Sequence, residues 1–134
     1  MPSVSEYCKT QPRTAGPGFS LLLMGMVMRD FNIDCVVVVD NRKAEGPRRP
    51  VGILSDREIV RSWVRYPNKK IHHIRMDEVM AEPYVVKESA DLTETLDGMR
   101  EKAVLFAPVV SEEGSLVGLL SLDALTARPA LAAE

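Results

Sequence analysis

Residues 51–60, VGILSDREIV, place a glycine, a hydroxyl group and two carboxyl groups within one short stretch. The apolar run from Val51 to Leu54 predicts a strand, and Ser55 stands where a helix would begin. The Ser55 hydroxyl can accept a hydrogen bond from a free amide of the first helical turn. Asp56 and Glu58 then place negative charge near the positive end of the helix dipole. Taken alone, this stretch predicts a capped turn from a strand into a helix.

The sequence offers no residue set that is typical of catalysis or of a metal site. No Ser, His and Asp stand at a recognisable motif spacing, and neither a glycine-rich phosphate loop nor a defined pair of carboxylates is present. His72 and His73 are adjacent, so on a strand they would point to opposite faces, and no third ligand stands at a metal-site spacing. We therefore expect neither an enzyme nor a metal-binding protein.

Composition sets the class of protein. The 134 residues are 46% hydrophobic and 27% charged, which is enough for one sizeable core. The net charge of -2 gives no support to binding of nucleic acid through a basic face. The two cysteines, Cys8 and Cys35, fit a reducing compartment better than a disulfide framework. No apolar run could span a bilayer and no signal peptide is visible at the N-terminus, so we expect a cytoplasmic protein without membrane partners.

An internal repeat organises the chain. Residues 27–41 match residues 98–112 at a spacing of 71, and the same spacing relates Pro12 to Pro83. Further along, residues 50–60 match residues 116–126 at a spacing of 66. The shorter spacing places five additional residues in the loop 41–50 of the first copy, where insertions are tolerated. We divide the chain into a first repeat, 1–70, and a second repeat, 71–134, which ends in a short tail.

Each repeat predicts a strand, a helix, a strand hairpin and a second helix. For the first repeat we expect an atypical strand at RTAGPG (13–18), a helix from about Phe19 to Phe31, strands 35–39 and 51–54, and a helix from Ser55 to about Arg65. For the second repeat we expect a strand at 84–86, a helix from Asp91 to Lys102, strands 104–110 and 116–120, and a helix from Ser121. Such a unit cannot bury both faces of its sheet alone. We expect an α/β (α+β) fold in which two small sheets pack face to face with flanking helices.

The order of apolar run, acidic residue, loop and VGILSDREIV resembles a CBS domain, and the paired copies resemble a CBS pair, or Bateman module. The stretch DEVMAEP (77–83) is similar to the linker of that family. The resemblance extends from about Glu6 to Thr126. It implies a freestanding regulatory module that senses an adenosyl compound in a cleft between the repeats and modulates a partner protein. The implied ligands are AMP, ATP, adenosine and S-adenosylmethionine, and no cofactor is required. The alternative is an interaction or scaffold protein of the same fold without a ligand.

The resemblance also implies which residues bind. The family motif is Gly, two apolar residues, Ser or Thr, two free positions and Asp. In the first copy it corresponds to Gly52, Ser55 and Glu58. The glycine would let the backbone approach the ligand, and the hydroxyl and carboxylate would hydrogen-bond the ribose. The second copy has Gly118 and Ser121, but it has Ala124 at the acidic position and Asp123 one residue early. We therefore expect this second cleft to be degraded.

In the family each cleft combines the motif of one copy with the first strand of the other. The resemblance therefore completes the Ser55 cleft with Tyr84, Val85 and Val86 of the first strand, and it adds Leu105, Phe106 and Pro108 near the start of the second strand. Nucleotide-binding members often carry basic side chains just before the second strand, where this chain has Leu105 and Phe106. The matching residues of the first copy are Asp34 and Cys35, and a carboxylate there would repel phosphate. Arg57 and Arg61 could supply positive charge, or they could be surface groups of the helix.

The stretch LLLMGMVM, from Leu21, has two readings: a membrane or partner surface, or core plus a dimer contact. Methionine fills irregular apolar gaps and the stretch is too short to span lipid, which favours the second reading. The family resemblance also implies a homodimer that forms through helical faces. No feature of the sequence identifies the partner protein that would be regulated.

Overall fold

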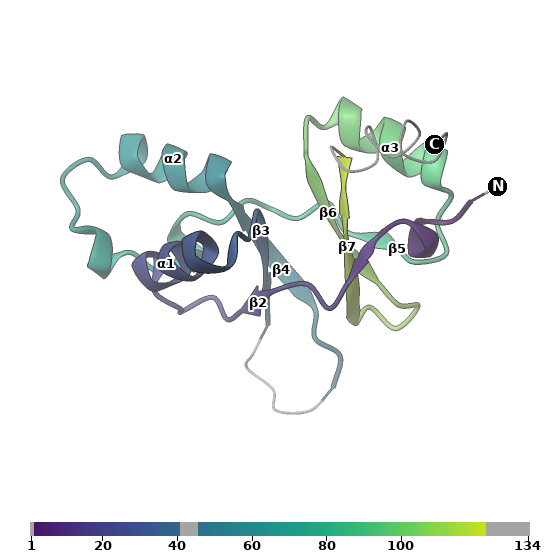
Figure 1. The fold of residues 1–134 in the computed structure, drawn as a ribbon, viewed down its shortest axis with the longest axis horizontal. Helices are drawn as coiled ribbons and strands as arrows, with labels where there is room; N and C mark the ends of the chain where they lie inside the picture. The colour runs from purple at the N-terminus through teal and green to yellow at the C-terminus, as the bar shows by residue number, and fades with distance from the viewer. Residues whose placement is uncertain (1, 41–45, 123–134) are drawn as a thin grey trace. The chain divides into compact units, whose positions relative to one another are not determined.

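The computed structural model describes residues 2–40 and 46–122, and the chain divides into two compact units (Figure 1). Residues 13–83 form one unit, named the Ser55 unit below. Residues 1–12 and 84–134 form the other, named the Ser121 unit. Each unit contains a small sheet and helices, which confirms the mixed α/β class. The face-to-face packing of the two sheets stays a prediction.

The Ser55 unit is built on a three-stranded sheet in the order β2-β3-β4. The strands are β2 (Thr14–Ala15), β3 (Cys35–Val39) and β4 (Pro50–Ser55). β2 runs parallel to β3, whereas β3 and β4 form the predicted antiparallel hairpin with Cys35 opposite Ser55. All five residues of β3 are buried, as expected for a cysteine followed by four β-branched valines.

Two α-helices and two short 3-10 helices complete this unit. They are α1 (Leu21–Phe31), α2 (Asp56–Arg65), η2 (Ile71–His73) and η3 (Met76–Glu78). The Ser20 hydroxyl caps α1 by accepting from the Leu23 amide at 3.2 Å, and Asn32 ends the helix in the left-handed conformation that asparagine tolerates. The helices pack on a core shared with the sheet, whose members are Leu21, Met24, Met28, Val36, Val38, Leu54, Ile74, Met76 and Val79.

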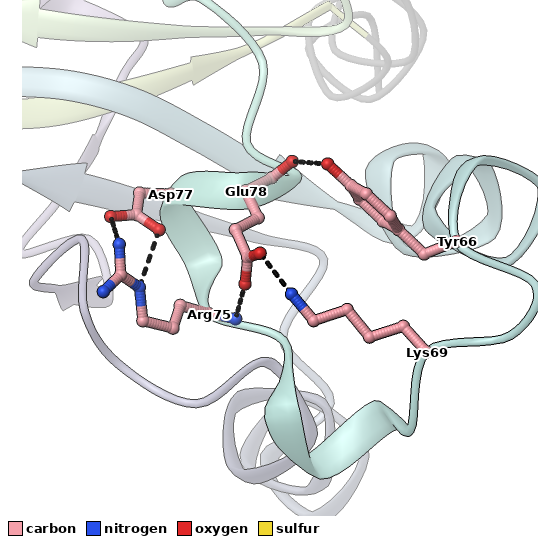
Figure 2. Close-up of polar contacts among 5 residues, drawn as sticks. All are labelled: Tyr66, Lys69, Arg75, Asp77 and Glu78. Atoms are coloured by element: carbon pink, nitrogen blue, oxygen red, sulfur yellow. Dashed lines mark hydrogen bonds and ion pairs between the residues drawn. The ribbon is translucent and has the colours of Figure 1, made fainter.

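Hydrogen bonds and ion pairs connect the segment after α2 with η3. Figure 2 shows the Glu78 carboxylate between Lys69, with which it forms an ion pair, and the Arg75 amide, from which it accepts a hydrogen bond at 2.7 Å. The Tyr66 hydroxyl donates to the Glu78 carbonyl at 3.4 Å, and the Arg75 guanidinium pairs with Asp77. Lys69 and the Arg75 amide hold the pKa of Glu78 below its ordinary value. The network therefore links Tyr66 and Lys69, which follow α2, to η3.

The Ser121 unit has a four-stranded sheet in the order β1-β7-β6-β5. Its elements are η1 (Val4–Glu6), β1 (Lys9–Thr10), β5 (Val86–Lys87), α3 (Leu92–Glu101), β6 (Phe106–Val110) and β7 (Leu116–Ser121). Its core consists of Val4, Val86, Leu92, Met99, Ala107, Val109 and Leu120. The Asp91 carboxylate caps α3 by accepting from the Glu94 amide at 3.0 Å, as predicted for that position.

The repeat read from the sequence is present in the structure. β3 and β6 are related by the spacing of 71 residues, and β4 and β7 by the spacing of 66. Both hairpins change register at matched positions, between Val38 and Val39 and between Val109 and Val110. The equivalence of strands 51–54 and 117–120 is therefore confirmed. The first strand of the second repeat is β5, which begins two residues later than predicted, and almost all of the helix predicted from Ser121 lies outside the described residues.

The compact units differ from the repeats drawn at 1–70 and 71–134, because each leading segment packs with the other copy. β1 pairs with β7, with Lys9 opposite Leu119, so residues 1–12 join the Ser121 unit. In the Ser55 unit, the backbone of Ala81 exchanges two hydrogen bonds with Ile53, at 2.9 and 3.0 Å. Among the described residues no helix has the length and apolar character needed to cross a membrane.

Candidate functional site

The centre of the candidate site is the junction of β4 and α2. Ser55 is the last residue of β4 and the N-cap of α2, and Glu58 lies in the first turn of that helix. Glu58 Oε1 accepts hydrogen bonds from the Ser55 amide at 2.7 Å and from the Ser55 hydroxyl at 2.6 Å. The capped turn predicted from the sequence is thus present, but the hydroxyl donates to Glu58 and the carboxylate caps the serine amide.

Both polar residues are buried. Glu58 is 6% exposed and Ser55 is 9% exposed. A buried carboxylate is stable only where hydrogen bonds replace its hydration, and Oε1 receives two. The other oxygen, Oε2, has no partner among the described residues. Glu58 therefore has a fixed position and one acceptor oxygen that is not used by the described part of the protein.

The surroundings of this junction are negatively charged. Cys35 lies opposite Ser55 in the β3–β4 hairpin, next to the exposed Asp34. Burial raises the pKa of the Cys35 thiol, and the negative charges of Glu58 and Asp34 raise it further. Cys35 is therefore a neutral, buried thiol, in agreement with the packing role predicted for it. Of the two candidate phosphate-binding arginines on α2, Arg57 is half-buried and Arg61 is exposed.

The motif glycines have a packing role in the structure. A Cβ atom on Gly52 would lie 2.7 Å from Met80 Cγ and closer still to Met80 Sδ. A Cβ atom on Gly118 would lie 2.7 Å from Cys8 Sγ and 2.9 Å from the backbone oxygen of Lys9. Each glycine thus makes room for the leading segment that covers its hairpin. Sequence reasoning assigned the missing side chain to ligand approach and missed these contacts, because Met80 is distant in sequence.

The three residues expected to hold the base do not share one environment. Tyr84 and Val86 both pack against the core of the Ser121 unit, and the Tyr84 hydroxyl lies against α3 at Gly98. Val85 lies between them in sequence and is 41% exposed. Alternate residues of an extended chain point to opposite sides, so Val85 is the one that presents its side chain away from this core.

The remaining expected residues lie in the β6–β7 hairpin. Phe106 is opposite Ser121, and Pro108 is fully buried opposite Leu119. The Leu105 carbonyl accepts a hydrogen bond from the Leu122 amide at 2.9 Å. Asp123 lies outside the described residues. The structure therefore groups Gly52, Ser55 and Glu58 in one unit and Phe106, Pro108, Gly118 and Ser121 in the other.

The adjacent histidines are on η2, with ring centroids 4.2 Å apart. Across residues 2–40 and 46–122, no three His, Cys, Asp or Glu side chains come together in a way that could hold a metal ion.

Comparisons with known proteins agree with this architecture. Residues 76–129 match the family model described as CBS domain. An uncharacterized protein from Methanopyrus kandleri is 29% identical to the chain over 133 residues, which are 98% of the chain. The chain spans 65% of the length of that relative.

Two solved structures share the fold along nearly the whole chain. A CBS domain protein from Pyrobaculum aerophilum, PAE2072, complexed with AMP, matches with a TM-score of 0.80 and 20% identity, over 99% of this chain and 100% of that one. The CBS domain pair of protein MJ0100, in complex with 5'-methylthioadenosine and S-adenosyl-L-methionine, has a TM-score of 0.80 and 18% identity, over 100% of this chain and 99% of that one. The TM-scores show that the fold is shared, and at identities of 18% and 20% the likeness shows the fold alone.

Proposed function

Because the chain has the fold of a CBS-domain pair, we propose that it is a regulatory module that binds an adenosyl compound at the Ser55–Glu58 junction and modulates a partner protein. The observation that supports this proposal is the Glu58 carboxylate, which is 6% exposed and holds Oε2 without a partner among the described residues. No fully buried side-chain oxygen of the described residues lacks a hydrogen bond, so Oε2 keeps some contact with solvent and can accept a hydrogen bond from a ligand. The two structural neighbours carry adenosyl compounds, which supports that ligand class.

The chemistry of the junction suits a ribose. Glu58 Oε2 can accept a hydrogen bond from one ribose hydroxyl, and the Ser55 oxygen can accept one from the other while it donates to Oε1. The residues that the sequence predicts to hold the base, Tyr84, Val85 and Val86, belong to the Ser121 unit. There Tyr84 and Val86 pack in a core, and of these three Val85 is the one with an exposed side chain.

We further propose that the preferred ligand carries no phosphate. Glu58 and Asp34 both place negative charge around Cys35 and Ser55, and that charge repels an anion. Adenosine and S-adenosylmethionine, which is positively charged at sulfur, should therefore bind more tightly than AMP or ATP. The Ser121 motif should bind more weakly or not at all, because Ala124 offers no acceptor.

The test is calorimetry with adenosine, S-adenosylmethionine and AMP on the wild type and on two variants. Glu58→Gln keeps an oxygen for the Ser55 amide but removes the charge, so ligand binding should fall by about one to two orders of magnitude. Ser121→Ala is the matched control and should leave the affinity nearly unchanged. Equal losses in both variants, or an affinity untouched by Glu58→Gln, would contradict the proposal.

One observation favours a second candidate, a scaffold of the same fold without a ligand. Met80 and the Cys8–Lys9 segment occupy the space beside the motif glycines. Thermal unfolding separates the two candidates, since a ligand at a hundred times its dissociation constant adds about 2.7 kcal/mol of stability. No stabilisation by any of the adenosyl compounds would favour the scaffold. For either candidate we place the protein in the cytoplasm, where Cys8 and Cys35 stay reduced.

A further inference from the structure

The two compact units carry opposite net charge. Residues 13–83 contain 12 Lys and Arg against 9 Asp and Glu, which is a net charge of +3. Residues 1–12 and 84–134 contain 5 Lys and Arg against 10 Asp and Glu, which is a net charge of -5. The overall charge of -2 therefore conceals one basic unit, and an uneven distribution of this kind is typical of chains that bind a charged partner.

Positive charge in the Ser55 unit is concentrated around the end of α2. Residues 59–76 include five Lys and Arg and contain no Asp or Glu. Continued at the spacing of 66, the second copy has Ala127 where the first has Arg61, and Leu131 where the first has Arg65. The positive charge is therefore a feature of the first copy and is not part of the repeat.

Five exposed side chains on α2 and on the segment after it form what we name the basic surface: Arg61, Arg65, Lys70, His72 and His73. The two arginines are one helical turn apart and share a face of α2. Tight turns continue the segment, because the Lys69 amide donates to the Tyr66 carbonyl at 3.3 Å and the His73 amide to the Lys70 carbonyl at 2.9 Å. The basic surface thus lies on hydrogen-bonded backbone.

Tyr66 connects the helix with the segment that follows. The Arg65 guanidinium lies 5.5 Å from the centroid of the Tyr66 ring, and Lys69 Nζ lies 5.6 Å from the same centroid. The Tyr66 hydroxyl donates to the Glu78 carbonyl at 3.4 Å. One aromatic ring therefore holds cations from the helix and from the following turn close together.

The acidic groups that follow the basic surface are already paired. Figure 2 shows Asp77 paired with Arg75, at 2.7 Å, and Glu78 paired with Lys69. Across residues 2–40 and 46–122, in contrast, none of the three cations Arg61, Arg65 and Lys70 forms an ion pair. These three cations are therefore available to an anionic partner.

We propose that the basic surface binds an acidic segment of a partner protein, whose carboxylates pair with Arg61, Arg65 and Lys70. Val64 is 80% exposed and shares the helical face of the two arginines, so an apolar side chain of the partner finds a contact beside the charges. The ring nitrogens of His72 and His73 can donate further hydrogen bonds to carboxylates. This inference names the chemistry of the partner in the proposed regulatory function and rests on that part of it, but it requires no adenosyl ligand.

A protein segment fits this surface better than a long polyanion does. Nucleic acid extends its negative charge over many nucleotides, and it would meet a chain of net charge -2 with one unit at -5. A short acidic segment meets only the local positive charge. Arginine is also enriched in protein interfaces, where its planar group pairs with carboxylates.

Fluorescence anisotropy on the whole chain tests the proposal, with a labelled synthetic peptide of glutamate and leucine and with no adenosyl compound present. The wild type should bind this peptide, with an affinity that falls as salt is added, and should not bind a matched peptide of glutamine and leucine. Arg61→Gln combined with Lys70→Gln should weaken binding by about tenfold. Arg100→Gln combined with Lys102→Gln is the control, because it removes the same two residue types from the Ser121 unit, and it should leave the affinity nearly unchanged.

Asp77→Asn provides a test in the opposite direction. It removes the carboxylate that pairs with Arg75, so this guanidinium joins the available cations and the affinity for the glutamate peptide should rise about threefold.

The proposal would be overturned by a wild type that does not bind the glutamate peptide, by equal losses in the two double variants, or by an Asp77→Asn variant that binds more weakly. Tighter binding to single-stranded DNA or to phosphatidylserine vesicles than to the peptide would also overturn it, because the surface would then belong to that class of partner. None of these outcomes bears on the calorimetry of Glu58→Gln, so the docking surface and the adenosyl site can fail separately.

Discussion

Replacement of Glu58 separates its structural role from its charge. Glu58 Oε1 is the acceptor for the Ser55 amide at 2.7 Å and for the Ser55 hydroxyl at 2.6 Å. Glu58→Ala removes both hydrogen bonds and leaves the amide of a residue that is 9% exposed without an acceptor. Glu58→Gln retains a carbonyl oxygen for both donors but carries no charge.

The size of the effect follows from opposing contributions. An unsatisfied buried donor costs about 1–3 kcal/mol, and a helix loses about 0.5–2 kcal/mol with its cap. The two costs overlap, because the Ser55 amide is both the unsatisfied donor and the capped group. The loss of stability is reduced further because Glu58→Ala also removes the desolvation cost of a buried charge. We expect Glu58→Ala to lower the free energy of unfolding by about 2 kcal/mol, and Glu58→Gln by about half of that, since hydrogen bonds to charged groups are roughly twice as strong as neutral ones.

Urea unfolding followed by circular dichroism measures both values. Asp56→Asn is the control, because Asp56 is exposed in the same helical turn and interacts chiefly with the helix dipole, so its loss should stay within about 0.5 kcal/mol. A loss below about 0.5 kcal/mol in Glu58→Ala, or equal losses in Glu58→Ala and Asp56→Asn, would refute the reasoning, because Glu58 would then act as a surface charge.

Three further outcomes follow from the contacts of the two units. In urea unfolding, Gly118→Ala should destabilise the protein more than Gly52→Ala. The Cβ added at Gly118 would lie 2.9 Å from the backbone oxygen of Lys9, whereas the Cβ added at Gly52 meets the flexible side chain of Met80. Equal losses of stability in the two variants would contradict this prediction. The Cys35 thiol should react with a thiol reagent at pH 8 only as fast as the protein unfolds, since burial and nearby carboxylates raise its pKa; rapid labelling of the native protein would contradict this. Asp34→Asn should raise the affinity for AMP about threefold while leaving that for adenosine unchanged in calorimetry, and an equal change for both would show that its charge does not act on the ligand.

The sequence predicted the long elements and their repetition well, because these depend on local patterns. The helices from Ser20 to Asn32 and from Asp91 to Lys102 carry recognisable caps, and the strand CVVVV contains four consecutive β-branched valines. The structure places all three within two residues of the predicted bounds.

The short strands and the division into units could not be predicted in the same way. β1, β2 and β5 have two residues each, which is too short for an alternating pattern. The pairing of Lys9 with Leu119 joins residues that are far apart in the sequence, and it depends on the tertiary fold rather than on local preference. The capping role of Glu58, in contrast, was visible in principle, because Ser followed three residues later by Glu is the signature of a capping box.

The two repeats serve as controls for each other, because matched residues occupy equivalent places in nearly the same backbone. A residue type that both copies share at a matched position, such as the glycine of each hairpin, is explained by packing that both require. A difference at a matched position has no such explanation. Glu58 is matched by an alanine, which has no acceptor in its side chain. The hydrogen bonds from the Ser55 amide and hydroxyl to Glu58 therefore belong to the first repeat, and packing that both repeats require does not explain them.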